Sequence, residues 1–422
     1  MTNLSNAMKA ELERLAEELV PNAQSKKQPL TAESLCEFMK QHKIRVRYDD
    51  ITHELCVSGT SLPAEHSTEQ LSTLLFSLLR ADGGYSGVSQ QTIESFISLI
   101  AVNDRFNPVR DLLSAVKWDG VDRLPALFSI MRIDNDLLSK KLVIRWLGQT
   151  IALSCFNETG LPFGAEGVLT LCGRQGIGKT TLIGRLGLNS RLCKLGVNID
   201  PHNKDDIIQA TGCFVCELGE LESTMKRDLA ALKAFLTAHT DEVRRPYARA
   251  ATRTRRRTSF AASCNSRDFL ADPTGNRRFF TIPCEQRFDL AELAKFDMVQ
   301  LWAQIFAEVS EEADKSACFR LNADELKALC ERNGGFTKTI PAEQEVRDIL
   351  NDAAENPAKY EWKMLTVTDW AGYWLCLRKY SAQQIGRALE QCGIEALQQK
   401  VGSSGIKMRK VPIFKQKKNF WD

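Results

Sequence analysis

The chain has 422 residues, of which 43% are hydrophobic and 26% are charged, and its formal net charge is +3. This balance is typical of a folded protein of two or three domains and excludes a largely disordered chain. A net charge this small also excludes nucleic-acid binding through global charge, so any such argument depends on local clusters.

The cysteines and the hydropathy pattern indicate the cellular compartment in which we expect the protein. Thirteen cysteines are scattered in apolar runs, as expected of small core residues in a reducing cytosol. No apolar run reaches the length of about 18 residues that a membrane-spanning helix needs. We therefore expect a cytoplasmic protein that is neither exported nor inserted in a membrane.

The first third of the chain is predicted to form helices and one small β-hairpin. Residues 1–30 are predicted to be one helix followed by a polar linker. Residues 31–105 are predicted to form a small α+β module: a helix capped by Thr31, a hairpin around Asp49 and Asp50, and two amphipathic helices over residues 67–101. Residues 106–160 continue as a helical collar that ends in a long, apolar-striped helix.

The middle of the chain changes to short apolar runs that alternate with helices. These runs are GVLTLC, RLCKLGV, GCFVCEL, TSFAASCN and RRFFTIP. Near-continuous apolar runs of this length are typical of strands buried on both faces of a parallel sheet. We therefore predict a doubly wound α/β domain over residues 161–310.

Residues 311–422 are predicted to form a helical, winged-helix-like C-terminal domain. Two helical stretches, the second ending at Cys392 and Gly393, precede two β-like segments joined by VGSSG. Lys407 and Arg409 belong to a basic run without acids and are predicted to contact a DNA backbone. A merely solubilising tail would be equally basic.

The stretch GRQGIGKTT, residues 173–181, fits the phosphate-loop pattern G-x-x-x-x-G-K-[ST] between a strand and a helix. Glycines let backbone N–H groups converge on phosphates, the lysine bridges phosphates, and the hydroxyl of Thr180 can bind Mg²⁺. A glycine-rich turn with a solvated lysine is the alternative. The predicted ATP-binding residues are Gly173, Gly176, Gly178, Lys179, Thr180 and Thr181.

Hydrolysis needs a carboxylate near the metal and a group that orients water. Glu217 ends a predicted strand, and Glu220 follows it. If this strand lies beside the phosphate-loop strand, Glu217 binds Mg²⁺ through water and Glu220 polarises the attacking water, although the two roles are exchangeable and either carboxylate could be a solvated turn residue. Asn265 ends another strand, where it would sense the γ-phosphate, hold the water, or simply cap the strand.

Arginines are concentrated in two places. Seven lie between Val243 and Ser259, a segment predicted to form a β-hairpin with Arg249 at its tip, and Arg249 and Arg253 are predicted to bind DNA. Pairing with acids of the surface or of neighbouring subunits is the alternative. Arg277 or Arg278 is predicted to reach a γ-phosphate held by an adjacent subunit, the other making an ion pair within the chain because alternate strand residues face opposite ways.

Several motifs taken together resemble the virulence-associated protein E family, whose members are P-loop ATPases similar to superfamily 3 helicases. They are FNPVRDLLSAVKWDGVDRL, GRQGIGKTTL, ELGELE, LKAFLTAHTDEVRRPYARA and LADPTGNRRFFTIP. The resemblance implies an AAA+-type core in a ring, with Lys179 and Thr180 in the Walker A motif, Glu217 and Glu220 in the Walker B region, and Asn265 as sensor 1. It also implies that Arg277 or Arg278 is an arginine finger and that the segment around Arg249 lines a pore. The family's usual TTN is SCN in this chain, and primer synthesis is not predicted.

The leading hypothesis is an ATP-dependent DNA helicase or replication initiator of a phage or mobile genetic element. It would use ATP and Mg²⁺, assemble as a homo-oligomeric and probable hexameric ring, and act on single-stranded or forked DNA. A DNA-binding ATPase switch, acting as a loader or phage-defence sensor, is the alternative. A small-molecule kinase is a third hypothesis, which would not need the arginine hairpin.

Overall fold

The structure of the protein is a computed structural model that describes residues 27–59, 68–158, 160, 162–219, 229–243, 252–265, 269–270, 276–336, 341–401 and 404–415. By their internal contacts the residues form two compact units: the first comprises residues 1–267 and 273–334, and the second comprises residues 268–272 and 335–422. No helix in the described part of the chain combines the length and the apolar character that crossing a lipid bilayer requires.

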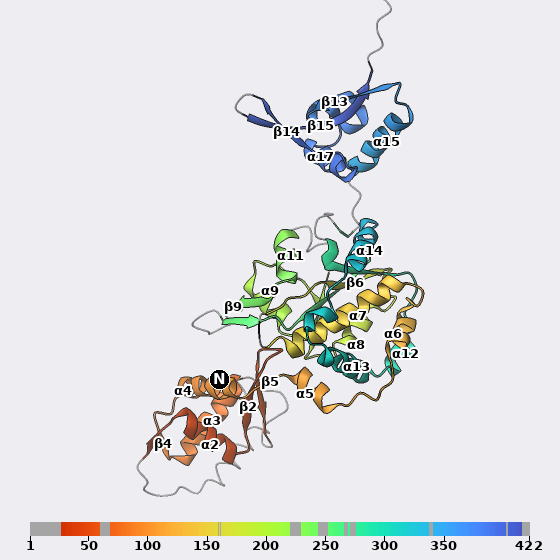
Figure 1. Ribbon diagram of the computed structural model, residues 1–422. Helices are drawn as coiled ribbons and strands as arrows, with labels where there is room; N and C mark the ends of the chain where they lie inside the picture. The colour runs from red at the N-terminus through yellow and green to blue at the C-terminus, as the bar shows by residue number, and fades with distance from the viewer. Residues whose placement is uncertain are drawn as a thin grey trace, which may run out of the picture. The chain divides into compact units, whose positions relative to one another are not determined.

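The first unit begins with the small α+β module that the sequence predicted (Figure 1). Its helices are α2 (Ala32–Gln41), α3 (Thr68–Asp82) and α4 (Gln90–Asn103). Its strands are β1 (Gln28–Pro29), β2 (Arg45–Asp49), β3 (Leu55–Ser58), β4 (Tyr85–Ser86) and β5 (Arg105–Phe106). Strands β2 and β3 form the expected antiparallel hairpin, and Thr31 caps α2 as predicted.

The turn of this hairpin joins the module to the rest of the first unit. Ile51 is fully buried in the large apolar cluster of that unit. The two residues before it form ion pairs: Asp49 pairs with Arg191 at 3.0 Å, and Asp50 pairs with Arg257 at 3.6 Å. The module is therefore fixed to the unit by two adjacent ion pairs and by the buried apolar side chain that follows them.

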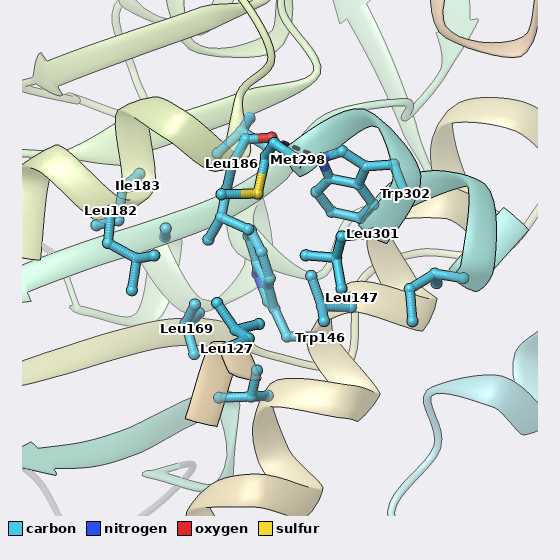
Figure 2. Packing of buried hydrophobic residues seen from close by; sticks show 14 of the residues in the cluster. Leu127, Trp146, Leu147, Leu169, Leu182, Ile183, Leu186, Met298, Leu301 and Trp302 are labelled. Atoms are coloured by element: carbon cyan, nitrogen blue, oxygen red, sulfur yellow. Dashed lines mark hydrogen bonds between the residues drawn. The ribbon is translucent and has the colours of Figure 1, made fainter. Parts of the chain in front are cut away.

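Three helices and a π-helix follow the module. They are α5 (Pro108–Ala115), α6 (Leu124–Met131), α7 (Leu137–Ile151) and the π-helix Ala152–Phe156. Helix α7 is buried from Trp146 to its end, and the indole N–H of Trp146 donates to the carbonyl of Phe260 at 2.8 Å. Figure 2 shows Trp146 and Leu147 packed among leucines of the sheet domain and beside Trp302.

The centre of the first unit is a five-stranded parallel sheet with the order β12-β6-β11-β8-β7. Its strands are β6 (Val168–Gly173), β7 (Cys193–Val197), β8 (Val215–Leu218), β11 (Ser259–Cys264) and β12 (Phe279–Cys284). The surrounding helices are α8 (Lys179–Leu186), α9 (Lys204–Thr211), α11 (Leu229–Leu236), α12 (Leu290–Lys295), α13 (Met298–Glu311) and α14 (Ala323–Gly334). The prediction of an α/β domain with a parallel sheet is confirmed.

Two details differ from the sequence-based expectation. Strand β8 does not lie beside β6, because β11 lies between them. Residues 311–334, which the sequence grouped with the C-terminal domain, belong to the first unit, where Arg332 of α14 pairs with Asp136 at 2.6 Å.

The second unit packs three helices on a three-stranded antiparallel sheet of order β13-β15-β14. Its helices are α15 (Pro341–Glu355), α16 (Val367–Tyr373) and α17 (Ala382–Gln391), and its strands are β13 (Tyr360–Leu365), β14 (Leu397–Val401) and β15 (Ser404–Phe414). Trp370 of α16 is fully buried, and its indole N–H donates to the carbonyl of Pro412 on β15 at 2.8 Å. This hydrogen bond connects the helix to the sheet. Helix α17 ends at Cys392 and Gly393, as predicted.

Candidate functional site

The phosphate-loop segment lies where the sequence placed it, between the end of β6 and the start of α8. Gly176 and Gly178 have φ values of 80° and 106°, a region that favours glycine. Gly173 approaches the neighbouring strand so closely that a Cβ there would lie 2.0 Å from the carbonyl oxygen of Cys284. The three predicted glycines are therefore required by the backbone path itself.

Lys179 opens α8 and is buried, with 6% of its surface exposed. Its Nζ donates to the carbonyl oxygens of Gly173 at 2.6 Å and Arg174 at 2.8 Å, and to Oδ1 of Asn265 at 3.0 Å. Asn265 directly follows β11, which pairs with β6 in parallel. The structure thus brings together two side chains that are 86 positions apart in the sequence.

A second contact joins the loop to β8. The hydroxyl of Thr180 donates to Oε1 of Glu217 at 2.9 Å, and Glu217 is almost fully buried. Glu217 reaches the loop although β11 separates its strand from β6, because Thr180 projects from the start of α8 toward it. Glu220, the other predicted carboxylate, lies outside the described residues.

Lys179, Thr180 and Asn265 lie on the wall of a cavity of about 340 Å³. Its walls are formed by Gln175, Gly176, Gly178, Lys179, Thr180, Thr181, Ser263, Asn265 and Leu290. Gln175, Ser263 and Leu290 were not predicted as site residues. Ser263 could have been found, since it is two positions before Asn265 and alternate residues of a strand face the same side.

The opposite edge of the sheet carries Arg277 and Arg278. They belong to a short 3-10 helix, Asn276–Arg278, that precedes β12, so the strand alternation used to separate their roles was wrong. Both line one cavity of about 560 Å³, together with Glu166, His239 and Arg320. Among the described residues, neither arginine has a recorded ion pair, and Nε of Arg278 is buried without a hydrogen-bond partner.

The arginine-rich segment forms part of the predicted hairpin. Strand β9 (Thr240–Val243) pairs antiparallel with β10 (Thr252–Arg255), and the turn with Arg249 lies outside the described residues. Arg253 is exposed on β10. Arg256, by contrast, is buried, pairs with Asp241 at 2.5 Å and lies over the ring of Phe235 at 4.5 Å.

Arg257 is also buried, and it pairs with Asp50 and Glu158. Hence part of the arginine run is structural, and the alternative of ion pairing holds for Arg256 and Arg257. In the second unit, Lys407 is exposed, whereas Arg409 is buried and paired with Glu390. The structure thus corrects the prediction for Arg409, whose charge is used inside its own unit.

The fold and this site define a mixed α/β protein in which a glycine-rich loop connects a central parallel strand to a helix. The model of the virulence-associated protein E-like domain matches residues 113–337, more than half of the chain. The chain belongs to this family, as its motifs indicated. A search of curated proteins found no match.

Solved structures provide a comparison of the fold. The apo structure of the NrS-1 C-terminal region (305–718) has a TM-score of 0.51 and 14% identity, covering 92% of this chain and 100% of that one. The A form apo structure of the same region has a TM-score of 0.50 and 14% identity, over 92% of this chain and 100% of that one. At this identity the likeness concerns the fold alone.

The reactivity of the Cys284 thiol is a measure of the packing beneath the phosphate loop. Burial raises the pKa of its thiol to about 12, against the opposing effect of the Lys179 ammonium. We expect iodoacetamide at pH 8 to leave Cys284 unmodified in the native protein and to alkylate the exposed Cys330, as measured by peptide mass spectrometry. In urea both should react. Equal modification of the two in the native protein would contradict the burial.

Proposed function

We propose that this protein is an ATP-hydrolysing DNA motor, a helicase or replication initiator of a phage or mobile genetic element, built on an AAA+-type P-loop core. The observation that carries the proposal is the convergence of Lys179, Asn265 and Thr180 on one cavity at the phosphate loop, with Glu217 hydrogen-bonded to Thr180. Its backbone N–H groups and buried ammonium fit a triphosphate, and its size suits the phosphates and ribose better than a large apolar ligand.

The chemistry assigned to the site is hydrolysis. The oxygen of a water molecule bonds to the γ-phosphorus, the bond from this phosphorus to the β–γ bridging oxygen breaks, and the proton of the water passes to phosphate or carboxylate. Thr180 and Glu217 offer the oxygen ligands that Mg²⁺ prefers and would hold it, and the ion would supply charge neutralisation at the phosphates. Glu220 remains a proposed residue for polarising the water.

The position of Arg277 and Arg278 supports a site shared between subunits. They precede β12, whereas the phosphate loop follows β6, and Phe279 is in register with Val168 while Cys284 is in register with Gly173. Six residues of strand span about 20 Å, so neither arginine reaches the phosphates of its own chain. Both arginines line a cavity of about 560 Å³, where their guanidinium groups could meet an acceptor from a neighbouring copy. We therefore propose a ring, with a hexamer as the expected form.

DNA contacts are proposed for the hairpin and for the second unit. Arg253 lies on β10 of the β9–β10 hairpin, and the Arg256–Asp241 pair at its base would keep it oriented. Arg249, outside the described residues, remains a proposed DNA contact. The order of helices and strands in the second unit supports a winged-helix module, with Lys407 on its β14–β15 hairpin. A DNA-binding switch without unwinding shares these residues, and strand displacement on forked DNA separates the two functions.

Lys179→Ala should abolish ATP hydrolysis, because no other group can replace its ammonium at the phosphates. The measurement is steady-state phosphate release from the purified chain, with and without forked DNA. Lys141→Ala, which removes an exposed lysine of α7, is the control and should behave as wild type. Hydrolysis retained by Lys179→Ala at more than a few per cent of wild type would refute the site.

Arg277→Ala or Arg278→Ala protein should lose activity and recover part of it when mixed with Lys179→Ala protein. At equal mixing, about a quarter of the interfaces of a cyclic assembly combine an intact phosphate loop with an intact arginine. Phosphate release should therefore return to about that fraction of wild type. Absence of recovery at every mixing ratio, with both proteins folded, would argue against a shared site.

Arg253→Ala should weaken DNA binding while leaving basal ATP hydrolysis unchanged. Loss of one phosphate contact should lower the slope of log affinity against log salt by about 0.7 to 0.9. Fluorescence anisotropy with labelled single-stranded DNA measures both quantities. Arg45→Ala is a matched control, since Arg45 is an exposed arginine of the α+β module that pairs with Asp104. An unchanged slope for Arg253→Ala would remove this residue from the DNA interface.

A further inference from the structure

Ser263 lies on β11, two positions before Asn265, and lines the cavity at the phosphate loop. Asn265, directly after the end of β11, lines the same cavity. Cys264, between them, faces the other side, where its Sγ donates to the carbonyl of Leu171 at 3.8 Å. The cavity therefore receives a hydroxyl group from the strand that also supplies the amide of Asn265.

The register of the sheet places this hydroxyl between two hydrogen bonds of the site, the one from Thr180 to Glu217 and the one from Lys179 to Asn265. Ser263 is paired with Leu171 of β6, and Ala261 is paired with Glu217 of β8. Paired residues of parallel strands project to the same face, and Ser263 alternates with Ala261, so Glu217 and Ser263 project to a common side. Ser263 lies one strand from Glu217 and about 7 Å further along the strand direction, toward the edge where Asn265 meets Lys179.

The hydroxyl of Ser263 can form hydrogen bonds with a molecule in the cavity. Glu217 accepts from Thr180, and Asn265 accepts from Lys179, whereas no hydrogen bond of the Ser263 hydroxyl is recorded among the described residues. A serine hydroxyl can donate one hydrogen bond and accept others. A water molecule that attacks phosphorus needs an acceptor for one of its protons and a fixed position in line with the bond that breaks.

We propose that Ser263 is a further catalytic residue of this site, whose hydroxyl accepts a hydrogen bond from the attacking water and holds it between Asn265 and Glu217. This inference rests on the proposed function, since it concerns the hydrolysis of a nucleoside triphosphate. Ser263 does not bind the triphosphate in the ground state. Its loss therefore acts on the rate of the chemical step and leaves the affinity for the nucleotide in place.

The test compares Ser263→Ala with Ser263→Thr. The alanine variant should hydrolyse ATP about ten to a hundred times more slowly, because one hydrogen bond to a reacting group is lost. Its KM, and its affinity for a fluorescent ATP analogue, should stay within about twofold of wild type. The threonine variant keeps the hydroxyl and should recover kcat to within about threefold.

Two comparisons separate catalysis from packing. Cys264→Ser changes the neighbouring side chain on the other face of β11, keeps a donor for the carbonyl of Leu171, and should hydrolyse ATP as wild type does. Alanine already occupies the two positions before Ser263 on this strand, so the Ser263→Ala chain is compatible with the sheet, and thermal unfolding verifies it. If kcat followed side-chain volume, with threonine worse than alanine, a packing role would replace the catalytic one.

The outcomes also distinguish this inference from the proposed function. The proposed function itself would be overturned if the wild-type chain hydrolysed no ATP, or if its hydrolysis did not depend on Lys179. A wild-type chain that hydrolyses ATP, together with a Ser263→Ala variant whose kcat lies within twofold of it, would overturn only the role of Ser263. A Ser263→Ala variant with normal kcat and raised KM would likewise contradict it, because the hydroxyl would then act in binding.

Discussion

The buried ammonium of Lys179 is the constraint on which the arrangement of the site depends. An ammonium removed from water needs acceptors for its three protons, and Lys179 has three: two carbonyl oxygens of its own loop, at 2.6 and 2.8 Å, and the amide oxygen of Asn265 at 3.0 Å. The first two require a loop that curls back on itself, which the positive φ values of Gly176 and Gly178 permit. The third requires that β11 end beside β6. One charge thus links loop conformation, sheet order and the position of Asn265.

The arginines of this protein have two different uses that charge alone does not separate. Arg256 and Arg257 precede β11, are buried, and meet carboxylates from distant parts of the chain, Asp241 for the first and Asp50 with Glu158 for the second. Removing Asp241 would leave the buried charge of Arg256 without its carboxylate, which is costly. Arg253, only three positions earlier, is exposed on its strand. Within this basic segment, Arg253 on β10 is therefore exposed at the surface, whereas the two arginines just before β11 are buried and stabilise the fold.

The sequence predicted the parts of the site that depend on local pattern. Lys179, Thr180 and the glycines follow from a motif, and Glu217 and Asn265 follow from polar residues at the ends of apolar strands. Sheet order could not be predicted, because the apolar runs of β8 and β11 are equivalent as sequence. Ser263 was missed although its spacing to Asn265 offered a signal, and its place on the cavity wall comes from the structure. The burial of Arg409 was missed for a similar reason, since Glu390 is its partner only through the fold.

The polarity of the parallel sheet makes the two ends of the first unit chemically different. All five strands run in one direction, so the phosphate loop and Asn265 lie at one edge, and the residues that precede β12 lie at the other. A cation placed before β12 is therefore about 20 Å, the length of six strand residues, from the glycine-rich loop of its own chain. Arg277 and Arg278 line a cavity with Arg320 at that far edge. If these arginines act on a phosphate, the phosphate belongs to another molecule, and the sheet itself then imposes the requirement for assembly.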